Sequence, residues 1–366
     1  MHIRTNRERL ILALSKVGGV VERRQTLPIL GNLFVSASGD LVTLIGTDLE
    51  IEIRSHFTAS VEEPGDITLP ARKLIDICKA VPEDANIGIL VRDQRATITA
   101  GKSRFNLSTL PATDFPLMES TSGNERIEVD QLVLKGLLDM TSFAMAQQDV
   151  RYYLNGLYFK VEAGCITVVA TDAHRMAKVE REIELTISES MDVIFPRKTV
   201  LELIRLLGTG KELVRLDLSE KMLRASVGGT VLTSKLIDGR YPDYQRVIPI
   251  LTDKVALVNC ELFRQSLLRT SILSNEKYKG IRLGFSSGRL TLQAHNPEQE
   301  EAEEEVEIDY TQVPTAIGFN VGYLLDVLGV VDEDRIEIHF TDSNSSALIR
   351  GEGRGDQSFV VMPMRL

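Results

Sequence analysis

The 366-residue sequence has no tryptophan, only 5% aromatic residues and only three cysteines. Cys78, Cys165 and Cys260 form no CxxC pair, which excludes a disulfide framework or a zinc ribbon and fits a reducing compartment. No apolar run approaches the roughly 18 residues of a membrane span, and the N-terminus is charged rather than signal-like. We therefore expect a cytoplasmic protein without a membrane partner.

What the sequence does contain is a threefold internal repeat. The residues that open the first strand-like run of each repeat are spaced by 124 positions: Leu33, Leu157 and Ile281. The residues that close the following hairpin have the same spacing: Asp48, Asp172 and Asn296. Independent positions with one common spacing indicate repeated domains, whereas the alternative is a single large α+β domain with coincidental hairpins.

Three near-equal domains fill the chain, and we predict them at 1–121, 122–249 and 250–366. Apolar residues recur at helical spacing twice in each domain. The six helix-like segments are Asn6–Val17, Ala71–Ala80, Asp130–Gln148, Arg197–Leu207, Glu261–Asn275 and Val321–Val330. Two helices beside several alternating strands predict an α+β fold with helices on one side of β-sheets.

Positive charge is scarce overall, because 52 acidic residues outnumber 42 basic ones and the net charge is −10. DNA-binding domains are usually basic, so the acidic balance of the whole chain argues against nucleic-acid binding. The six helix-like segments nevertheless sum to +5, which leaves −15 on the strands and loops. The distribution indicates a basic helical face on an acidic body, although scatter of this size also occurs by chance.

Charge also differs between the two ends of the chain. Seven glutamates lie in Glu298–Glu307, where alternating apolar residues indicate an edge strand kept soluble by charge. The segment Arg92–Arg104 is a basic counterpart in the first domain. Opposite charges at opposite ends favour head-to-tail association, and two chains of three domains could close a six-domain ring.

Catalytic patterns are few. Asp172 and His174 form an Asp-x-His pair that could supply metal ligands to a hydrolase. Because Asp172 recurs as Asp48 and Asn296, a turn residue that bonds its own backbone is the simpler interpretation. The sequence contains no P-loop, GxSxG, HExxH or GxGxxG motif, so we expect no enzyme, cofactor or metal.

The C-terminal segment is unusually apolar for a chain end. We predict that Phe359–Val361 is a last paired strand. Met362–Leu366 continues past it with two methionines, which are common at surfaces that accept several partners. This segment is predicted to line a groove for a partner peptide.

Nine blocks of the sequence resemble the bacterial DNA polymerase III beta subunit family, the replicative sliding clamps. The blocks are Thr26–Asn32, Thr47–Glu50, Ser103–Pro116, Gln148–Gly156, Thr171–Arg175, Asp238–Val247, Ile272–Leu283, Asn296–Glu304 and Val360–Leu366. The resemblance runs along the whole chain. It implies a homodimeric ring of six domains around duplex DNA, with helices inside and sheets outside, that acts as a non-catalytic processivity factor in the bacterial cytoplasm.

The resemblance also implies partners that bind through short peptides: the replicative polymerase, the clamp loader, repair and translesion polymerases, ligase and mismatch-repair proteins. DNA contact is implied for Arg24, Gln148, Tyr152, Tyr153, Arg197 and Lys198. Arg72 and Lys73 are added because they occupy the repeat position of Arg197 and Lys198. Core packing is the alternative role for the two tyrosines, and a non-DNA scaffold or a hydrolase is the alternative function.

Two protein interfaces follow from the same resemblance. In the dimer, Ile272 and Leu273 would meet Leu107, and Arg95, Lys102 and Arg104 would face Glu298, Glu300, Glu301, Glu303 and Glu304. The peptide groove would consist of Leu154, Thr171, His174, Arg175, Met176, Pro242, Arg246, Val247, Asn320, Tyr323, Ser346, Val360, Met362, Pro363, Met364 and Arg365. Ala173 replaces a frequent glycine and Asn344 a frequent apolar residue, so the peptide preference is expected to shift.

Overall fold

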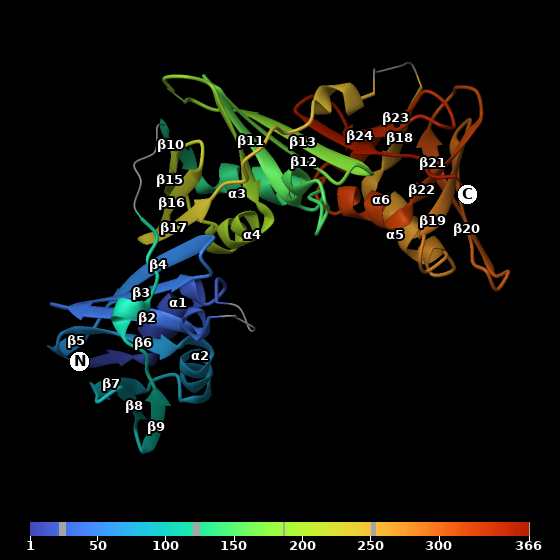
Figure 1. The fold of residues 1–366 in the computed structure, drawn as a ribbon. Helices are drawn as coiled ribbons and strands as arrows, with labels where there is room; N and C mark the ends of the chain where they lie inside the picture. Colours follow the sequence, from blue (N-terminus) through green and yellow to red (C-terminus); the bar gives the residue numbers. More distant parts are fainter. Residues whose placement is uncertain (22–26, 120–124, 186, 250–253, 366) are drawn as a thin grey trace. The chain divides into compact units, whose positions relative to one another are not determined.

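The computed structural model describes residues 1–21, 27–119, 125–185, 187–249 and 254–365. The helices of this part are α1 (Arg7–Val17), α2 (Ala71–Ala80), α3 (Gln131–Ser142), α4 (Arg197–Leu206), α5 (Cys260–Ser271) and α6 (Val321–Leu328) (Figure 1). None of them is long and apolar enough to cross a membrane. The boundary predicted at 121/122 lies outside the described residues, and the boundary predicted at 249/250 lies at the edge of the described range that ends at 249.

The strands of the described residues form three antiparallel sheets. The first has the order β5 (Ser60–Glu63), β1 (His2–Asn6), β7 (Asn86–Arg92), β8 (Arg95–Ala100), β9 (Ser103–Ser108). The second has the order β10 (Glu125–Asp130), β15 (Leu213–Leu218), β16 (Met222–Val227), β17 (Thr230–Lys235), β4 (Ile51–Thr58), β3 (Leu41–Thr47), β2 (Asn32–Ser38), β6 (Gly65–Pro70). The third has the order β14 (Met191–Pro196), β11 (Gly156–Glu162), β12 (Cys165–Thr171), β13 (Arg175–Glu182), β25 (Gln357–Val361), β24 (Ala347–Gly351), β23 (Arg335–His339), β18 (Val255–Asn259), β21 (Glu301–Asp309), β20 (Arg289–His295), β19 (Gly280–Ser286), β22 (Thr315–Asn320).

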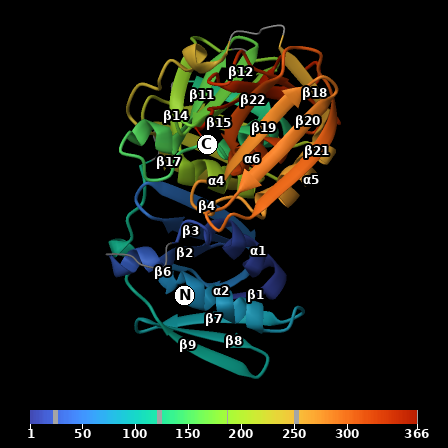
Figure 2. The ribbon, with the colours of Figure 1, turned by 90° about the vertical axis from the view of Figure 1, so that its right-hand side faces the viewer.

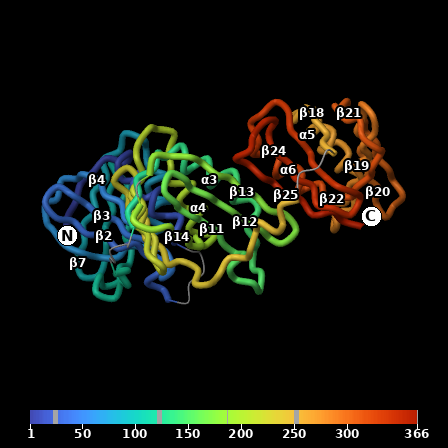
Figure 3. The backbone as a smooth tube through the Cα atoms, turned by 90° about the horizontal axis from the view of Figure 1, so that it is seen from above, coloured from blue at the N-terminus to red at the C-terminus, as the bar shows by residue number. Residues whose placement is uncertain are grey.

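Neighbouring repeats share a sheet. The second sheet joins four strands of the first repeat to four of the middle repeat through the β17–β4 pair. The third sheet joins the middle repeat to the last one through the β13–β25 pair, whose strands lie side by side in Figure 3. Two compact units result, residues 1–132 with 201–236 and residues 133–200 with 237–366, so the middle repeat contributes to both.

The first helix of each repeat begins in the same way. A polar N-cap residue (Asn6, Asp130 or Asn259) accepts a hydrogen bond from a first-turn amide. In the first and last repeats the apolar face of this helix packs on strands: α1 lies on β3 and β4, and α5 lies on β20 and β21, which are labelled in Figure 2. The predicted helix Asp130–Gln148 is too long, because α3 ends at Ser142 and the following chain turns back so that the Ala146 amide donates to the Leu154 carbonyl.

The acidic run forms β21. Along Glu301–Glu307 it pairs with β20, and on its other side it meets β18 only at Ile308 and Asp309 within the described chain. The glutamate-bearing half of β21 is therefore an open edge, as predicted. Charged side chains on such an edge oppose indiscriminate strand pairing.

Candidate functional site

The turn between β12 and β13 is built by Asp172. One carboxylate oxygen of Asp172 accepts hydrogen bonds from the amides of His174 and Arg175, both at 2.9 Å. Asp48 makes the matching bonds after β3, and the Asn296 side chain accepts from the Glu300 amide after β20. The predicted turn role is therefore confirmed, and within the described residues no cluster of three or more metal-ligating side chains occurs.

Ala173 follows Asp172 with a φ of +73°, in the left-handed region that favours glycine. We expect Ala173→Gly to raise the free energy of unfolding by up to about 1 kcal/mol, because the Cβ strain is removed. Thermal unfolding should show this as a higher midpoint. Ala80→Gly, in the last turn of α2, is the matched control and should lower the midpoint; a lower midpoint for Ala173→Gly would contradict the strain argument.

The C-terminal tail lies beside this turn. β25 pairs with β13 and β24, which confirms the predicted last strand at Phe359–Val361. Beyond it, the Met362 amide donates to the His174 carbonyl at 2.9 Å and the Met364 amide donates to the Gly318 carbonyl at 2.8 Å. Met362, Pro363 and Met364 remain partly exposed. The backbone of the tail is thus fixed while its apolar side chains stay accessible.

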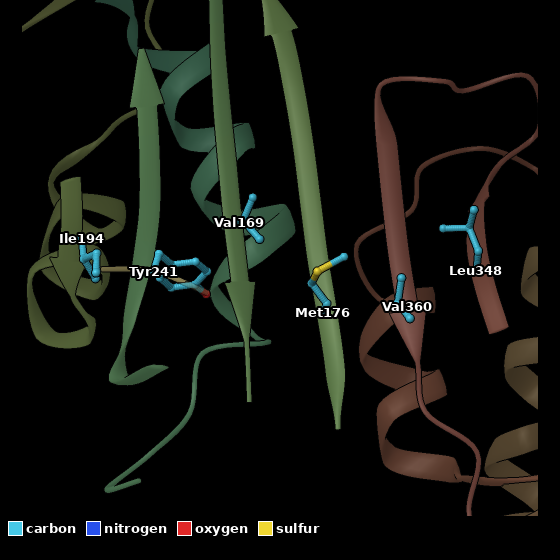
Figure 4. Packing of buried hydrophobic residues seen from close by; sticks show 6 residues of the cluster. All are labelled: Val169, Met176, Ile194, Tyr241, Leu348 and Val360. Atoms are coloured by element: carbon cyan, nitrogen blue, oxygen red, sulfur yellow. The ribbon is translucent and has the colours of Figure 1, made fainter. Parts of the chain in front are cut away.

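A buried apolar cluster underlies the tail and the turn. Figure 4 shows its members on successive strands and one loop: Val169, Met176, Ile194, Tyr241, Leu348 and Val360. Partly buried Tyr153, Tyr158, Ile237, Tyr244, Val247 and Ile248 pack against it. Met176, Val360 and Val247 were predicted for the groove, whereas Tyr241 was missed although it directly precedes Pro242 in a matching block. Burial raises the pKa of Tyr241, which keeps its hydroxyl neutral.

Arg175 connects the β12–β13 turn of this site to α6. Its guanidinium pairs with Asp172 and Asp326 and donates to the Phe143 carbonyl at 2.9 Å. The guanidinium carbon also lies 4.6 Å from the centroid of the Tyr323 ring. Arg175 was predicted as a groove contact, but its donors are engaged within the chain. It positions α6 and the β12–β13 turn.

The other predicted groove residues fall into three environments. Leu154 is buried, while Thr171, Ser346 and Tyr323 are partly exposed. Asn320 caps α6, because its side-chain oxygen accepts from the Gly322 and Tyr323 amides. The exposed members are His174, Pro242, Arg246 and Arg365, together with the variant position Asn344.

Two hollows include a few of these residues. One, of about 530 Å³, includes Pro242 and stacked Tyr158 and Tyr241, whose ring centroids are 5.1 Å apart. The other, of about 430 Å³, is lined by Met364 and Arg365. The other predicted groove residues line neither hollow.

The predicted DNA contacts are spread over helix starts and one loop. Arg24 lies outside the described residues. Gln148 and Tyr152 are exposed, whereas Tyr153 is partly buried and packs against the apolar cluster. Arg197 is partly buried and donates to the Met145 carbonyl; burial and, to a lesser degree, the Arg175 charge lower its pKa.

The register of α2 and α4 corrects one predicted correspondence. β6 ends at Pro70 and β14 ends at Pro196, and each helix begins at the next residue. Arg72 therefore matches Lys198, and Lys73 matches Thr199, one position from the predicted pairing. Arg72 and Lys73 are both exposed, and Lys198 is partly buried.

The predicted dimer residues lie on exposed elements. Ile272, directly after α5, is 76% exposed, and Leu273 is partly exposed. Leu107 is buried in its own domain, on the edge strand β9 that also carries exposed Arg104. Arg95, Lys102, Glu298, Glu300, Glu301 and Glu303 are exposed as well. Glu304 differs, because it pairs with Arg269 of its own chain at 2.6 Å.

Family models of the DNA polymerase III beta subunit match the chain in three parts. The N-terminal domain matches residues 1–119, the central domain 128–243 and the C-terminal domain 245–365. The beta sliding clamp of Pseudomonas putida is 49% identical and that of Escherichia coli 43% identical, each over the full length of both chains.

Solved structures agree with the sequence comparison. The DNA polymerase III subunit beta of Pseudomonas aeruginosa matches with a TM-score of 0.95 and 49% identity, over 100% of both chains. The Caulobacter crescentus beta sliding clamp matches with a TM-score of 0.96 and 41% identity, over 100% of this chain and 99% of that one. The resemblance and the α+β fold of three clamp domains are confirmed. The chain belongs to the DNA polymerase III beta subunit family, the beta sliding clamps.

Proposed function

We propose that two copies of this chain close head to tail into a ring around duplex DNA and tether the replicative polymerase to its template. Membership of the sliding-clamp family supports this function over a hydrolase or a non-DNA scaffold. The observation that carries the ring is the way in which one repeat joins the next within the chain. The domains at 1–121, 122–249 and 250–366 would be the units that the ring repeats.

Two such junctions are present in one chain. β17 of the middle repeat pairs with β4 of the first repeat, with Leu232 opposite Ile53. β25 of the last repeat pairs with β13 of the middle repeat, with Phe359 opposite Ala177. In both, the final strand of one repeat joins the hairpin strand of the preceding repeat.

The strands for a third junction are β9 and β21. Within the described chain β9 has a partner strand on one side only, and β21 has one on one side only along Glu301–Glu307. When the hairpins are matched by their pairing, Leu232 corresponds to Phe105 and Ile53 corresponds to Ala302. The third junction then places Phe105 opposite Ala302 of the partner subunit. A strand edge that needs a partner favours pairing with another chain.

The same register brings opposite charges together. Arg104 comes to lie opposite Glu303 of the partner subunit, and Lys102 lies opposite Glu305 of the partner subunit. Each opposite-charge pair across antiparallel strands contributes roughly 0.2–1 kcal/mol, and like charges in that position would be unfavourable. Two such interfaces per dimer would close six repeats, which is the closed alternative to an open filament.

A closed ring can stay on DNA without binding it tightly. A polymerase held by contacts alone must bind tightly to stay and weakly to move. In a closed ring retention is topological, so basic residues such as Arg72, Lys73, Arg197 and Lys198, with Gln148 and Tyr152, need only weak contacts to phosphates. The acidic remainder of the surface would disfavour DNA outside the ring. Nothing in this role requires catalysis, a cofactor or a metal.

The apolar tail and the exposed groove residues would receive short peptides from partner enzymes. These are the replicative polymerase, the clamp loader, repair and translesion polymerases, ligase and mismatch-repair proteins. Tethering through one groove raises the effective concentration of each enzyme at the primer end. The methionines of the tail suit several peptides, because their flexible side chains adapt to different shapes. This role places the protein in the bacterial cytoplasm.

The test is retention on circular against linear DNA. After loading on a nicked circle, the protein should co-elute with the DNA through gel filtration at high salt, and it should be lost when the circle is cut. Blocking the cut ends with bound protein should restore retention, because the ring can then no longer slide off. Equal retention on open linear DNA would overturn the topological mechanism.

A further inference from the structure

The end of α1 is held by an arginine of α4. Arg205 donates to the carbonyls of Ser15 and Lys16, in the last turn of α1. The same guanidinium pairs with Glu202, one turn earlier in α4, at 2.5 Å. Gly19 abuts this carboxylate so closely that a Cβ on it would lie 2.4 Å from a Glu202 oxygen. A cation and an acid thus cover carbonyls that the helix itself leaves without amide partners.

A related arrangement lies at the junction between the middle repeat and the last repeat. Asp326 of α6 occupies the position of Glu202, as the matching ends of β14 and β22 show. It pairs with Arg175, which donates to the carbonyl of Phe143 just after α3. Phe143 follows α3 where Gly19 follows α1. An acid on the second helix and an arginine at the end of the neighbouring first helix therefore recur at both junctions within the chain.

The third copy of this arrangement is incomplete in a single chain. On α2, Asp76 and Lys79 stand at the positions of Glu202 and Arg205, and both are exposed. The remaining first-helix end is that of α5. Its Leu268 and Arg269 carbonyls accept one hydrogen bond each, from the Ser271 hydroxyl and the Ile272 amide, and a carbonyl oxygen has a second lone pair for another donor. Its buried face Phe263, Ser266, Leu267 and Thr270 matches the face Leu10, Ala13, Leu14 and Val17 of α1. On this match Ile272 takes the place of Gly19.

No arginine of α5 covers this helix end. Its own last-turn arginine, Arg269, is turned away to Glu304, with hydrogen bonds of 2.6 and 2.8 Å. The acid next to Gly19 is Glu202. At the other two junctions the corresponding acids are the shorter Asp326, beside Phe143, and Asp76, which would lie beside Ile272. The shorter acid leaves space for the larger side chain after the helix.

We infer that Asp76 and Lys79 form the third such contact between a second helix and the end of a first helix, which we call the latch. In it the Lys79 ammonium donates to the last-turn carbonyls of α5 in the partner subunit. This inference rests on the head-to-tail dimer proposed as the function and adds a helix contact to its strand contact. Lys79 would donate to backbone carbonyls. Its contribution to dimer stability therefore requires a hydrogen-bond donor at this position and does not depend on a particular acidic side chain in the partner subunit. Arginine, the residue of the matching position, should serve as well as lysine.

The test compares dimer dissociation constants by sedimentation or subunit exchange. Because a ring has two interfaces, Lys79→Ala should weaken the dimer by about tenfold to a hundredfold. Lys79→Arg should bind as tightly as the unmodified chain or more tightly. Lys221→Ala, at an exposed position between β15 and β16, removes the same charge and should leave the dimer unchanged.

The outcomes separate the latch from the ring. If the unmodified chain is monomeric at all concentrations, the proposed ring itself fails. If it dimerises and Lys79→Ala dimerises equally well, the latch is wrong and the ring stands. A lower melting temperature of the monomer with an unchanged dimer constant would show that Lys79 serves only its own helix. That result would also overturn the latch.

Discussion

Removal of Met362–Leu366 should abolish binding of partner peptides while the dimer persists. The tail supplies Met362 and Met364 beside the turn at His174, and its backbone is fixed by hydrogen bonds to the His174 and Gly318 carbonyls. Apolar anchors of this kind dominate peptide affinity, so a loss on the order of a hundredfold or more is expected. A fluorescent peptide from the polymerase of the same organism, titrated by anisotropy, measures it.

The deletion leaves the sheet intact, because β25 ends at Val361 and keeps its pairs with β13 and β24. The residues proposed for the dimer on β9 and β21 are also untouched. Met362→Ala should cause an intermediate loss, and Met222→Ala on β16 is the matched control that should bind normally. Undiminished affinity of the shortened chain would remove the tail from the binding site, and a monomeric shortened chain would mean that the deletion damages more than the groove.

The fold could be predicted where its cause is local or repeated. Asp172 was identified as a turn residue because it recurs at the same spacing, and its hydrogen bonds confirm the reason. The end of α3 could not be predicted, because apolar residues continue through Met145 and only the return of the chain to Leu154 ends the helix.

The site could be predicted only in outline. Resemblance placed Arg175 in the groove, but its side chain is committed to Asp326, 151 residues away, which no local pattern reveals. Tyr241 was missed for a similar reason, since its burial depends on Tyr158 and on strands that lie far from it in the sequence. Pairing between strands that are distant in the sequence also forms the junctions between repeats. The spacing of residues therefore revealed the repeats, but only the sheets show which strands join one repeat to the next.

Ile272→Ala combined with Leu273→Ala should convert the dimer into monomers. Ile272 is 76% exposed in the single chain, and it stands where Gly19 meets α4 at the junction within the chain. Each large aliphatic side chain buried at an interface contributes about 2 kcal/mol. Two such residues at each of two interfaces should weaken the dimer by at least on the order of a thousandfold.

Sedimentation velocity over a range of concentrations would measure this change, and circular dichroism would check that the monomer stays folded. Folding should survive, because an exposed side chain contributes little to the stability of its own domain. Leu262→Ala with Val313→Ala removes two similarly exposed apolar residues and is the matched control, which should remain dimeric. The double variant should also lose retention on circular DNA, since an open chain cannot be held topologically. A dimer with an unchanged sedimentation coefficient would place the interface elsewhere.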